Sequence, residues 1–317
     1  MKLLKRIKLN YNLKLFQDYI SSKSFNDAFN FIQDLNKKDK IDFFLLLKNS
    51  QELLTKLPQE FYQRKIIWTI SYDLSDVSYI NNFLNFYLSR NLNSSFTIEN
   101  FSNSLNQYFT NLDSKSQVQD IEFNDYLTQS NLYQNLLLFN SDKDFLFLNS
   151  CASFFETSQK NYFIHPNITF CYFYVIKRPE SLLSKYKKKH DTSEAAYDEL
   201  FNFREQQYLN EEQDKSNFKV YENRKNYNIN VKSWTDENVV NTFKGKIISF
   251  DRLLNDTENT LLEILYHLKQ YKLPVDINID DIKSFILNYE LNTTADGELS
   301  NNDKKFLQKN LDSAFDY

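Results

Sequence analysis

Two serines lie where a short apolar segment gives way to a helical pattern. Residues Lys65–Ser71 are apolar and β-branched, which predicts a buried strand, and Ser78–Leu88 carries apolar residues at helical spacing. The first N–H groups of a helix lack partners within the helix and lie at the positive end of its dipole, so they favour anions. Ser75 and Ser78 could therefore help to bind a phosphate, or they could simply cap the helix.

The same turn carries negative charge. Asp73 and Asp76 flank Ser75, and Leu74 supplies no cation. A carboxylate within about 5 Å of a phosphate would cost on the order of 1–3 kcal/mol at an effective dielectric constant of roughly 20–40. Helix capping by Ser75, Asp76 or Ser78 therefore remains an alternative to phosphate binding.

The densest group of cations begins where the strongest predicted strand ends. Ile168–Ile176 is dominated by β-branched and aromatic residues, and basic residues follow it directly. Open α/β sheets bind ligands at the carboxyl ends of their strands, so this cluster could receive a phosphate, or it could be a solvated helix face. Its members are Lys177, Arg178, Lys185, Lys187, Lys188 and Lys189.

Strands alternate with helices from residue 65 onward. Further strands are predicted at Phe145–Leu148 and Lys246–Phe250. Helices are predicted at Glu180–Lys189, Ser193–Gln213, Asp256–Leu268 and Ser300–Leu311. This alternation predicts an α/β fold with a mostly parallel sheet covered by helices on both faces.

The N-terminal part of the chain has helical periodicity instead. Helices are predicted at Leu13–Ile20, Phe25–Leu35 and Ile41–Leu57, and the pattern stops at Pro58. We therefore expect a helical N-terminal extension of residues 1–60, followed by an α/β domain of residues 61–317. Residues 89–140 are rich in Asn and Ser and are predicted to be helix or loop.

The strand–turn–helix unit resembles the phosphosulfate loop of the sulfotransferase family. That loop follows the first strand with a pattern close to Gly-Tyr-Pro-Lys/Arg-Ser-Gly-Thr-Thr-Trp-Leu. The positions that match it in register are Tyr72, Ser75, Ser78, Tyr79 and Ile80. The positions that depart from it are Ser71, Asp73, Leu74, Asp76 and Val77. In the family, these are the positions that bind the phosphate.

Later segments resemble the rest of the family pattern in the same order. In the family, a strand runs into Arg-x-Pro, and a serine follows on the next helix. In this chain Lys177 occupies the position of the Arg, and Lys185, one residue after Ser184, occupies the position of the Ser. In the family the Arg and the Ser hold the 3′-phosphate of 3′-phosphoadenosine 5′-phosphosulfate. The later matching stretches are Val231–Trp234, Lys246–Leu253, Pro274–Phe285, Ala295–Gly297 and Phe315–Tyr317, so the resemblance covers residues 62–317.

The resemblance implies a P-loop-like sheet and a single cleft that the two loops share. It also implies a general base near the second strand, which removes the proton of an acceptor hydroxyl. No base stands in register there, so Glu156 and His165 are the nearest candidates, and either could be structural instead. The residues expected to bind the nucleotide are Tyr72, Ser75, Asp76, Val77, Ser78, Lys177, Arg178, Ser184 and Lys185.

Two functions follow from this pattern. One is a sulfotransferase that moves a sulfuryl group from 3′-phosphoadenosine 5′-phosphosulfate to a hydroxyl of a carbohydrate or small molecule. The other is a catalytically inactive descendant that keeps the fold as an interaction or regulatory protein. A third interpretation, a helical Asn- and Lys-rich protein without nucleotide-binding ancestry, would place no central strand at Lys65–Ser71.

The composition of the chain argues against several classes of protein and of binding site. The net charge is −4, from 38 basic and 42 acidic residues, so no overall field favours nucleic acid. Cys151 and Cys171 are the two cysteines, which excludes a disulfide framework and a cysteine zinc site and fits a reducing cytoplasm. No His, Asp or Glu set has metal-ligand spacing, so no metal is expected. The longest apolar run, Ile168–Ile176, is too short to span a bilayer, and no secretory signal is expected.

Overall fold

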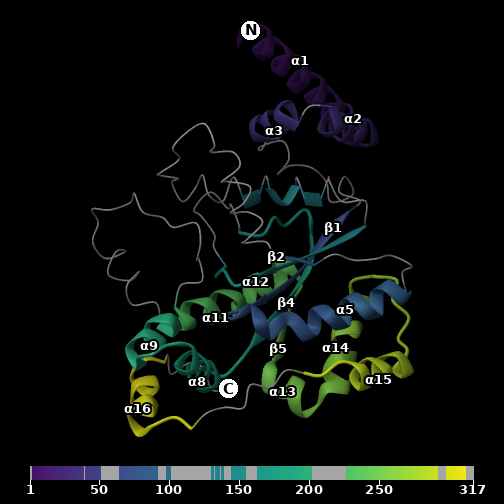
Figure 1. Cartoon of the computed structure of the whole chain (residues 1–317). Coiled ribbons are helices and arrows are strands. Elements are labelled where there is room, and N and C mark those ends of the chain that lie inside the picture. Colours follow the sequence, from purple (N-terminus) through teal and green to yellow (C-terminus); the bar gives the residue numbers. More distant parts are fainter. Residues whose placement is uncertain are drawn as a thin grey trace.

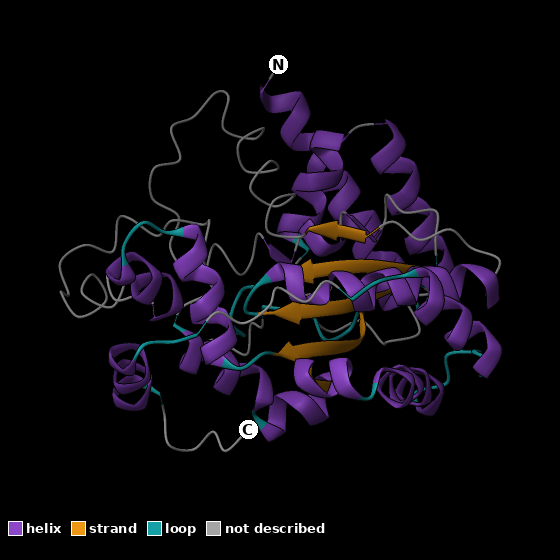
Figure 2. Ribbon diagram, turned by 60° about the horizontal axis from the view of Figure 1, so that its bottom comes forward, coloured by secondary structure: helices purple, strands orange, loops and turns teal. Residues whose placement is uncertain are grey.

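The structure is a computed structural model. The five strands among its described residues form one sheet in the order β2-β3-β1-β4-β5 (Figures 1 and 2). All neighbouring strands are parallel. The strands are β1 (Lys65–Ser71), β2 (Ile98–Asn100), β3 (Phe145–Ser150), β4 (Thr169–Ile176) and β5 (Gly245–Ser249). The structure describes residues 2–38, 40–50, 64–91, 98–100, 130–131, 133–135, 137–138, 144–154, 163–201, 226–291 and 298–311.

The prediction of a parallel α/β sheet is confirmed, and so is the position of its central strands. Lys65–Ser71 is a strand over the predicted residues, and β4 differs from its prediction only in starting at Thr169. Phe250, predicted as the end of β5, begins a helix instead, because the Ser249 side chain accepts a hydrogen bond from the backbone N–H of Arg252. The short edge strand β2 lies in a stretch predicted as helix or loop.

Alternate residues of each central strand point to opposite faces of the sheet. Trp68 and Tyr172 pack into one apolar cluster, whereas Ile67 and Phe173 pack into the other. Helices cover both faces (Figure 2). The Ile67 face is covered by α5 (Ser78–Asn91), α13 (Phe250–Asn255), α14 (Thr257–Gln270) and α15 (Ile279–Asn288). The Trp68 face is covered by α8 (Pro179–Lys189), α9 (Ser193–Phe201), α11 (Tyr227–Thr235) and α12 (Glu237–Phe243), with α16 (Asn301–Asn310) packed on α8.

Three helices precede the sheet and pack on one another. They are α1 (Lys2–Ser21), α2 (Phe25–Lys38) and α3 (Lys40–Asn49), and they lie at the top of Figure 1. Phe16, Ile32 and Phe43 are fully buried among them, because each helix turns its apolar side chains inward. The predicted boundary of the N-terminal extension, at residue 60, lies outside the described residues, so the extension as a separate unit stays a prediction.

Gly245 allows β5 to approach a buried tyrosine. Tyr172 lies opposite Gly245 in the β4–β5 register, and a methyl group added at residue 245 would lie 2.3 Å from Cζ of the Tyr172 ring. That ring cannot easily move, because Tyr172 is fully buried and its hydroxyl donates a hydrogen bond to the Trp234 carbonyl at 2.6 Å.

We expect Gly245→Ala to lower the free energy of unfolding by about 1–3 kcal/mol, the usual cost of overpacking a core. Urea denaturation of the two proteins measures the difference. An unchanged midpoint and slope would show that the Tyr172 ring is free to shift.

In the described part of the chain, no helix combines the length and the apolar content needed to cross a bilayer.

Candidate functional site

The two central strands send their following helices to opposite faces of the sheet. β1 leads through a 3-10 turn, Leu74–Val77, into α5, whereas its neighbour β4 leads into α8 on the other face. Between adjacent parallel strands this divergence opens a crevice at the carboxyl ends, where open α/β sheets bind ligands. The candidate site is therefore the β1–β4 crevice, formed by the turn after β1 and the segment from Lys177 to Lys185.

The turn after β1 is closed by its own polar groups. Asp73 caps it, because its Oδ1 accepts a hydrogen bond from the backbone N–H of Ser75 at 3.0 Å. The Asp76 N–H donates to the Asp73 carbonyl at 2.9 Å, and the Ser78 hydroxyl donates to the Ser75 carbonyl at 2.8 Å. The turn is therefore capped, which is the alternative to phosphate binding, and Asp73 is the capping residue.

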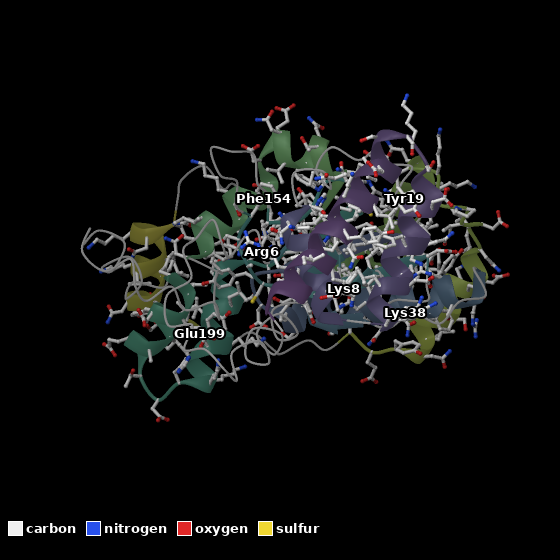
Figure 3. The ribbon with its side chains drawn as sticks, turned by 90° about the horizontal axis from the view of Figure 1, so that it is seen from above. Arg6, Lys8, Tyr19, Lys38, Phe154 and Glu199 are labelled. Carbon is white, nitrogen blue, oxygen red and sulfur yellow. The ribbon has the colours of Figure 1, made fainter. Side chains whose placement is uncertain are left out.

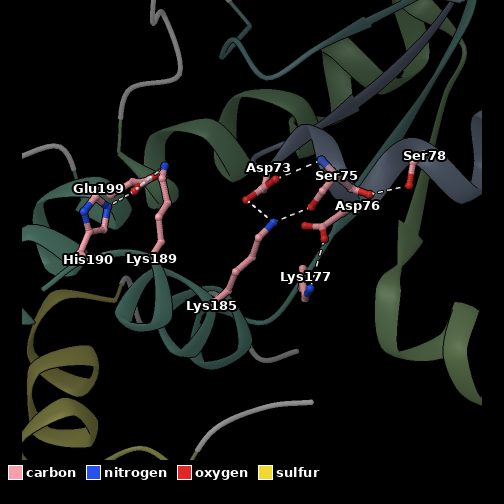
Figure 4. Close-up of polar contacts among 9 residues, drawn as sticks. All are labelled: Asp73, Ser75, Asp76, Ser78, Lys177, Lys185, Lys189, His190 and Glu199. Atoms are coloured by element: carbon pink, nitrogen blue, oxygen red, sulfur yellow. Dashed lines mark hydrogen bonds and ion pairs between the residues drawn. The ribbon is translucent and has the colours of Figure 1, made fainter. Parts of the chain in front are cut away.

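The predicted meeting of the two loops is confirmed, and they meet through ion pairs (Figure 4). Lys177 Nζ lies 3.1 Å from Asp76 Oδ1, with only 7% and 3% of the two side chains exposed. Lys185 Nζ lies 2.7 Å from Asp73 Oδ2 and donates to the Ser75 hydroxyl at 2.5 Å. The two loops therefore lie in direct contact, and a common ligand would require them to be this close.

The remaining cation of the crevice is paired as well. Arg178 forms an ion pair with Asp251 of α13. Each of Lys177, Arg178 and Lys185 thus faces a carboxylate of this chain, and the crevice gains no net positive charge from them. Lys177 Nζ also lies 4.5 Å from the centre of the Phe250 ring, which adds a cation–π contact.

The two carboxylates of the turn respond differently to their surroundings. Burial alone would raise the pKa of Asp73, but the hydrogen bonds from Lys185 and the Ser75 N–H lower that pKa below its ordinary value. Deeper burial raises the pKa of Asp76, although Lys177 opposes the rise. Asp76 Oδ2 and the Ser71 hydroxyl are buried and have no hydrogen-bond partner among the described residues.

Three predicted nucleotide-binding residues are buried, and two of them, Tyr72 and Val77, pack in the core instead of lining the crevice. Tyr72 is 2% exposed, and its hydroxyl donates to the Leu200 carbonyl at 2.6 Å, so its ring is not available for stacking on a ligand. Val77 is fully buried in the cluster beneath α5. Ser184 is buried on α8.

His165, one of the two candidate general bases, is not brought to the crevice. His165 lies just before β4 begins, whereas Lys177 follows its end, and a strand of this length spans roughly 25 Å. The imidazole Nδ1 accepts a hydrogen bond from the backbone N–H of Asn167 at 3.2 Å, and the His165 carbonyl accepts from the Thr169 N–H and hydroxyl. These contacts are those of a structural residue at a strand start. Glu156 lies outside the described residues.

His165 gives the protein a pH dependence with a definite sign. Burial lowers its pKa to about 4 from 6.5. The unfolded chain therefore binds the proton more tightly, and stability falls as pH decreases through the window between those values, by about 2 kcal/mol from pH 7 to pH 5. His165→Asn keeps an acceptor for the Asn167 N–H but cannot titrate. Urea denaturation at both pH values should show a smaller acid loss in the variant; equal losses would contradict this.

Other members of the basic cluster are paired beyond the crevice. Lys187 Nζ lies 2.7 Å from Asp303 Oδ2, and Lys189 Nζ lies 2.9 Å from Glu199 Oε1. Glu199 also forms a short contact with His190 (Figure 4). These carboxylates could not be predicted from the sequence, since nothing in the local pattern indicates which acidic residues of other elements will meet a lysine.

A hollow of about 340 Å³ lies elsewhere, between α1 and α2. None of the predicted site residues lines it, and its polar groups are mainly carboxylates and an amide. The lining residues are Tyr19, Asp27, Asn30, Phe31, Asp34, Leu35 and Lys38.

Within the described ranges, no group of three or more His, Cys, Asp and Glu residues could hold a metal ion. No protein-family model matches the chain, and no curated protein matches its sequence.

Proposed function

We propose that this chain is a catalytically inactive, sulfotransferase-like α/β protein that acts as an interaction or regulatory protein. In this proposal the turn after β1 corresponds to the P-loop-like phosphosulfate loop, and the β1–β4 crevice to the former nucleotide site. The observation that carries the proposal is the pairing of Lys177 and Lys185, the cations that face this turn, with Asp76 and Asp73.

Charge is the physical reason that this pairing argues against nucleotide binding. A phosphate entering the crevice would have to separate Lys177 from a carboxylate that is almost fully buried with it. Separating such a pair leaves an uncompensated buried charge, which costs about 3–5 kcal/mol. The phosphate would also meet Asp73 and Asp76 directly, and both carboxylates repel it.

The enzyme interpretation needs a general base at the crevice, and the candidate His165 does not supply it. A general base must lie within hydrogen-bond reach of the acceptor hydroxyl, directly or through one water. His165 lies at the other end of β4, and burial keeps its pKa low. A cytoplasmic location is part of the proposal, because neither Cys151 nor Cys171 forms a disulfide, as expected in a reducing compartment.

Titration of the full chain with adenosine 3′,5′-bisphosphate by calorimetry tests the proposal. We expect no saturable binding up to about 1 mM, which corresponds to less than about 4 kcal/mol of binding free energy. Saturable binding that weakens at least about tenfold in the Lys177→Ala, Arg178→Ala double variant, and less than about threefold in Lys188→Ala, Lys189→Ala, would support the enzyme interpretation instead.

A further inference from the structure

Helix α1 presents apolar and basic side chains together on its outer side. Ile7 and Tyr11 lie one helical turn apart and are 56% and 66% exposed. Arg6 and Lys14 are exposed beside them. We call these four residues the basic face of α1.

The charge of this helix differs from that of the chain. Lys2, Lys5, Arg6, Lys8 and Lys14 precede Asp18, the first acidic residue, while the whole chain has a net charge of −4. Lys8 lies 2.6 Å from Asp42 of α3, so its charge is balanced within the protein. Among the residues that the structure describes, no carboxylate is in ion-pair contact with Arg6 or Lys14.

The other side of α1 holds it in place. Phe16 is fully buried and Asn12 nearly so, against α2 and α3. Figure 3 views the molecule from the side on which these three helices lie, and Arg6 and Lys8 of α1 are labelled there. The basic face is therefore presented by a helix whose inner side is already packed.

We propose that the basic face of α1 binds the surface of a membrane that contains anionic lipids. Lys and Arg near such a surface are attracted to its headgroups, and their aliphatic stems can lie along the apolar layer. Ile7 and Tyr11 supply the shallow apolar contact that interfacial helices use, and the tyrosine hydroxyl can remain at the headgroup level.

A lipid surface fits this face better than an acidic protein does. A stable protein interface buries about 800 Å² on each partner around a packed apolar core, and two exposed apolar side chains on a convex helix do not supply one. A bilayer adapts to a convex helix and needs only shallow insertion together with electrostatic attraction. The inference does not depend on the crevice and goes beyond the proposed function.

Flotation of the full chain with phosphatidylcholine vesicles, with and without about 30% phosphatidylserine, tests the proposal. We expect binding to the anionic vesicles only, weakening as salt is raised. Arg6→Gln with Lys14→Gln should weaken binding roughly 25-fold, because each cation near an anionic surface contributes about fivefold. Ile7→Ser with Tyr11→Ser should weaken it at least about tenfold.

Lys283→Gln with Leu287→Ser is the matched control, since both residues are exposed on α15 and lie one turn apart. It should change binding by less than about twofold, and circular dichroism confirms that every variant is folded. Absence of binding by the parent, equal binding to neutral vesicles, or equal losses in the control would overturn the proposal. Binding to poly-glutamate in place of vesicles would overturn it in favour of an acidic protein partner.

Discussion

Asp76→Asn should lower the free energy of unfolding by about 3–5 kcal/mol, the cost of leaving a buried charge without its partner. The amide keeps the shape of the carboxylate but removes the charge that faces Lys177 Nζ at 3.1 Å. The lysine side chain is 7% exposed, so water cannot replace the lost carboxylate. Guanidinium denaturation followed by circular dichroism measures the change.

A double-mutant cycle separates the ion pair from the shape of the site. Lys177→Met keeps the aliphatic stem on the Phe250 ring and removes the charge. Asp76→Asn combined with Lys177→Met should be more stable than either single variant, since replacing both charges is often neutral whereas breaking one is costly. Additive losses in the double variant would show that the two charges do not interact.

The second large effect is expected at Asp303, which joins α16 to α8 and α9. Its carboxylate accepts hydrogen bonds from Lys187 Nζ at 2.7 Å, from the Tyr197 hydroxyl at 2.7 Å, and from the Ser300 N–H and hydroxyl. Asp303 is fully buried. Asp303→Asn should lower the free energy of unfolding by about 2–4 kcal/mol, because these donors lose a charged acceptor.

The same carboxylate predicts a pH dependence. Burial alone would raise the pKa of Asp303, but the donors from Lys187, Ser300 and Tyr197 hold it well below its ordinary value of 3.8. The stability it contributes is thus present above pH 4 or so and is lost as pH falls further, because the unfolded chain then binds more protons. In Asp303→Asn, the free energy of unfolding should therefore fall less steeply as the pH is lowered through this range.

Asp281 provides the matched control for Asp303. It pairs with Arg90 at 3.2 Å at the surface, where the arginine side chain is 52% exposed. Asp281→Asn should change stability by less than about 1 kcal/mol, as expected for a solvated pair. A loss at Asp303 no larger than the loss at Asp281 would contradict the role assigned to the buried carboxylate.

The strands could be predicted because their sequences are dominated by one physical property. Lys65–Ser71 and Thr169–Ile176 are buried on both faces, so they appear as continuous apolar, β-branched or aromatic runs. β2 has only three residues in a polar stretch, and so short a strand has no recognisable period. The segments that follow β1 and β4 were expected to lie close together, and two ion pairs join them.

The pairing inside that crevice could not be predicted. Lys177 and Asp76 are 101 residues apart in the chain, and Lys185 and Asp73 are 112 residues apart. Sequence alone placed both signs of charge near the expected ligand, but only the fold shows that they neutralise each other. His165 is misleading in the same way, because an imidazole in a turn gives no sign of whether it will be buried at the amino end of a strand.

The most direct test of the closed crevice is nucleotide titration of Asp73→Ser beside the parent. Serine can still cap the turn, while Lys185 loses its carboxylate partner and becomes available to a phosphate. Asp281→Ser removes a carboxylate elsewhere and serves as the control. We expect Asp73→Ser to bind adenosine 3′,5′-bisphosphate at least about tenfold more tightly than the parent or the control. Equal binding by the parent and the variant, or no binding by either, would contradict it.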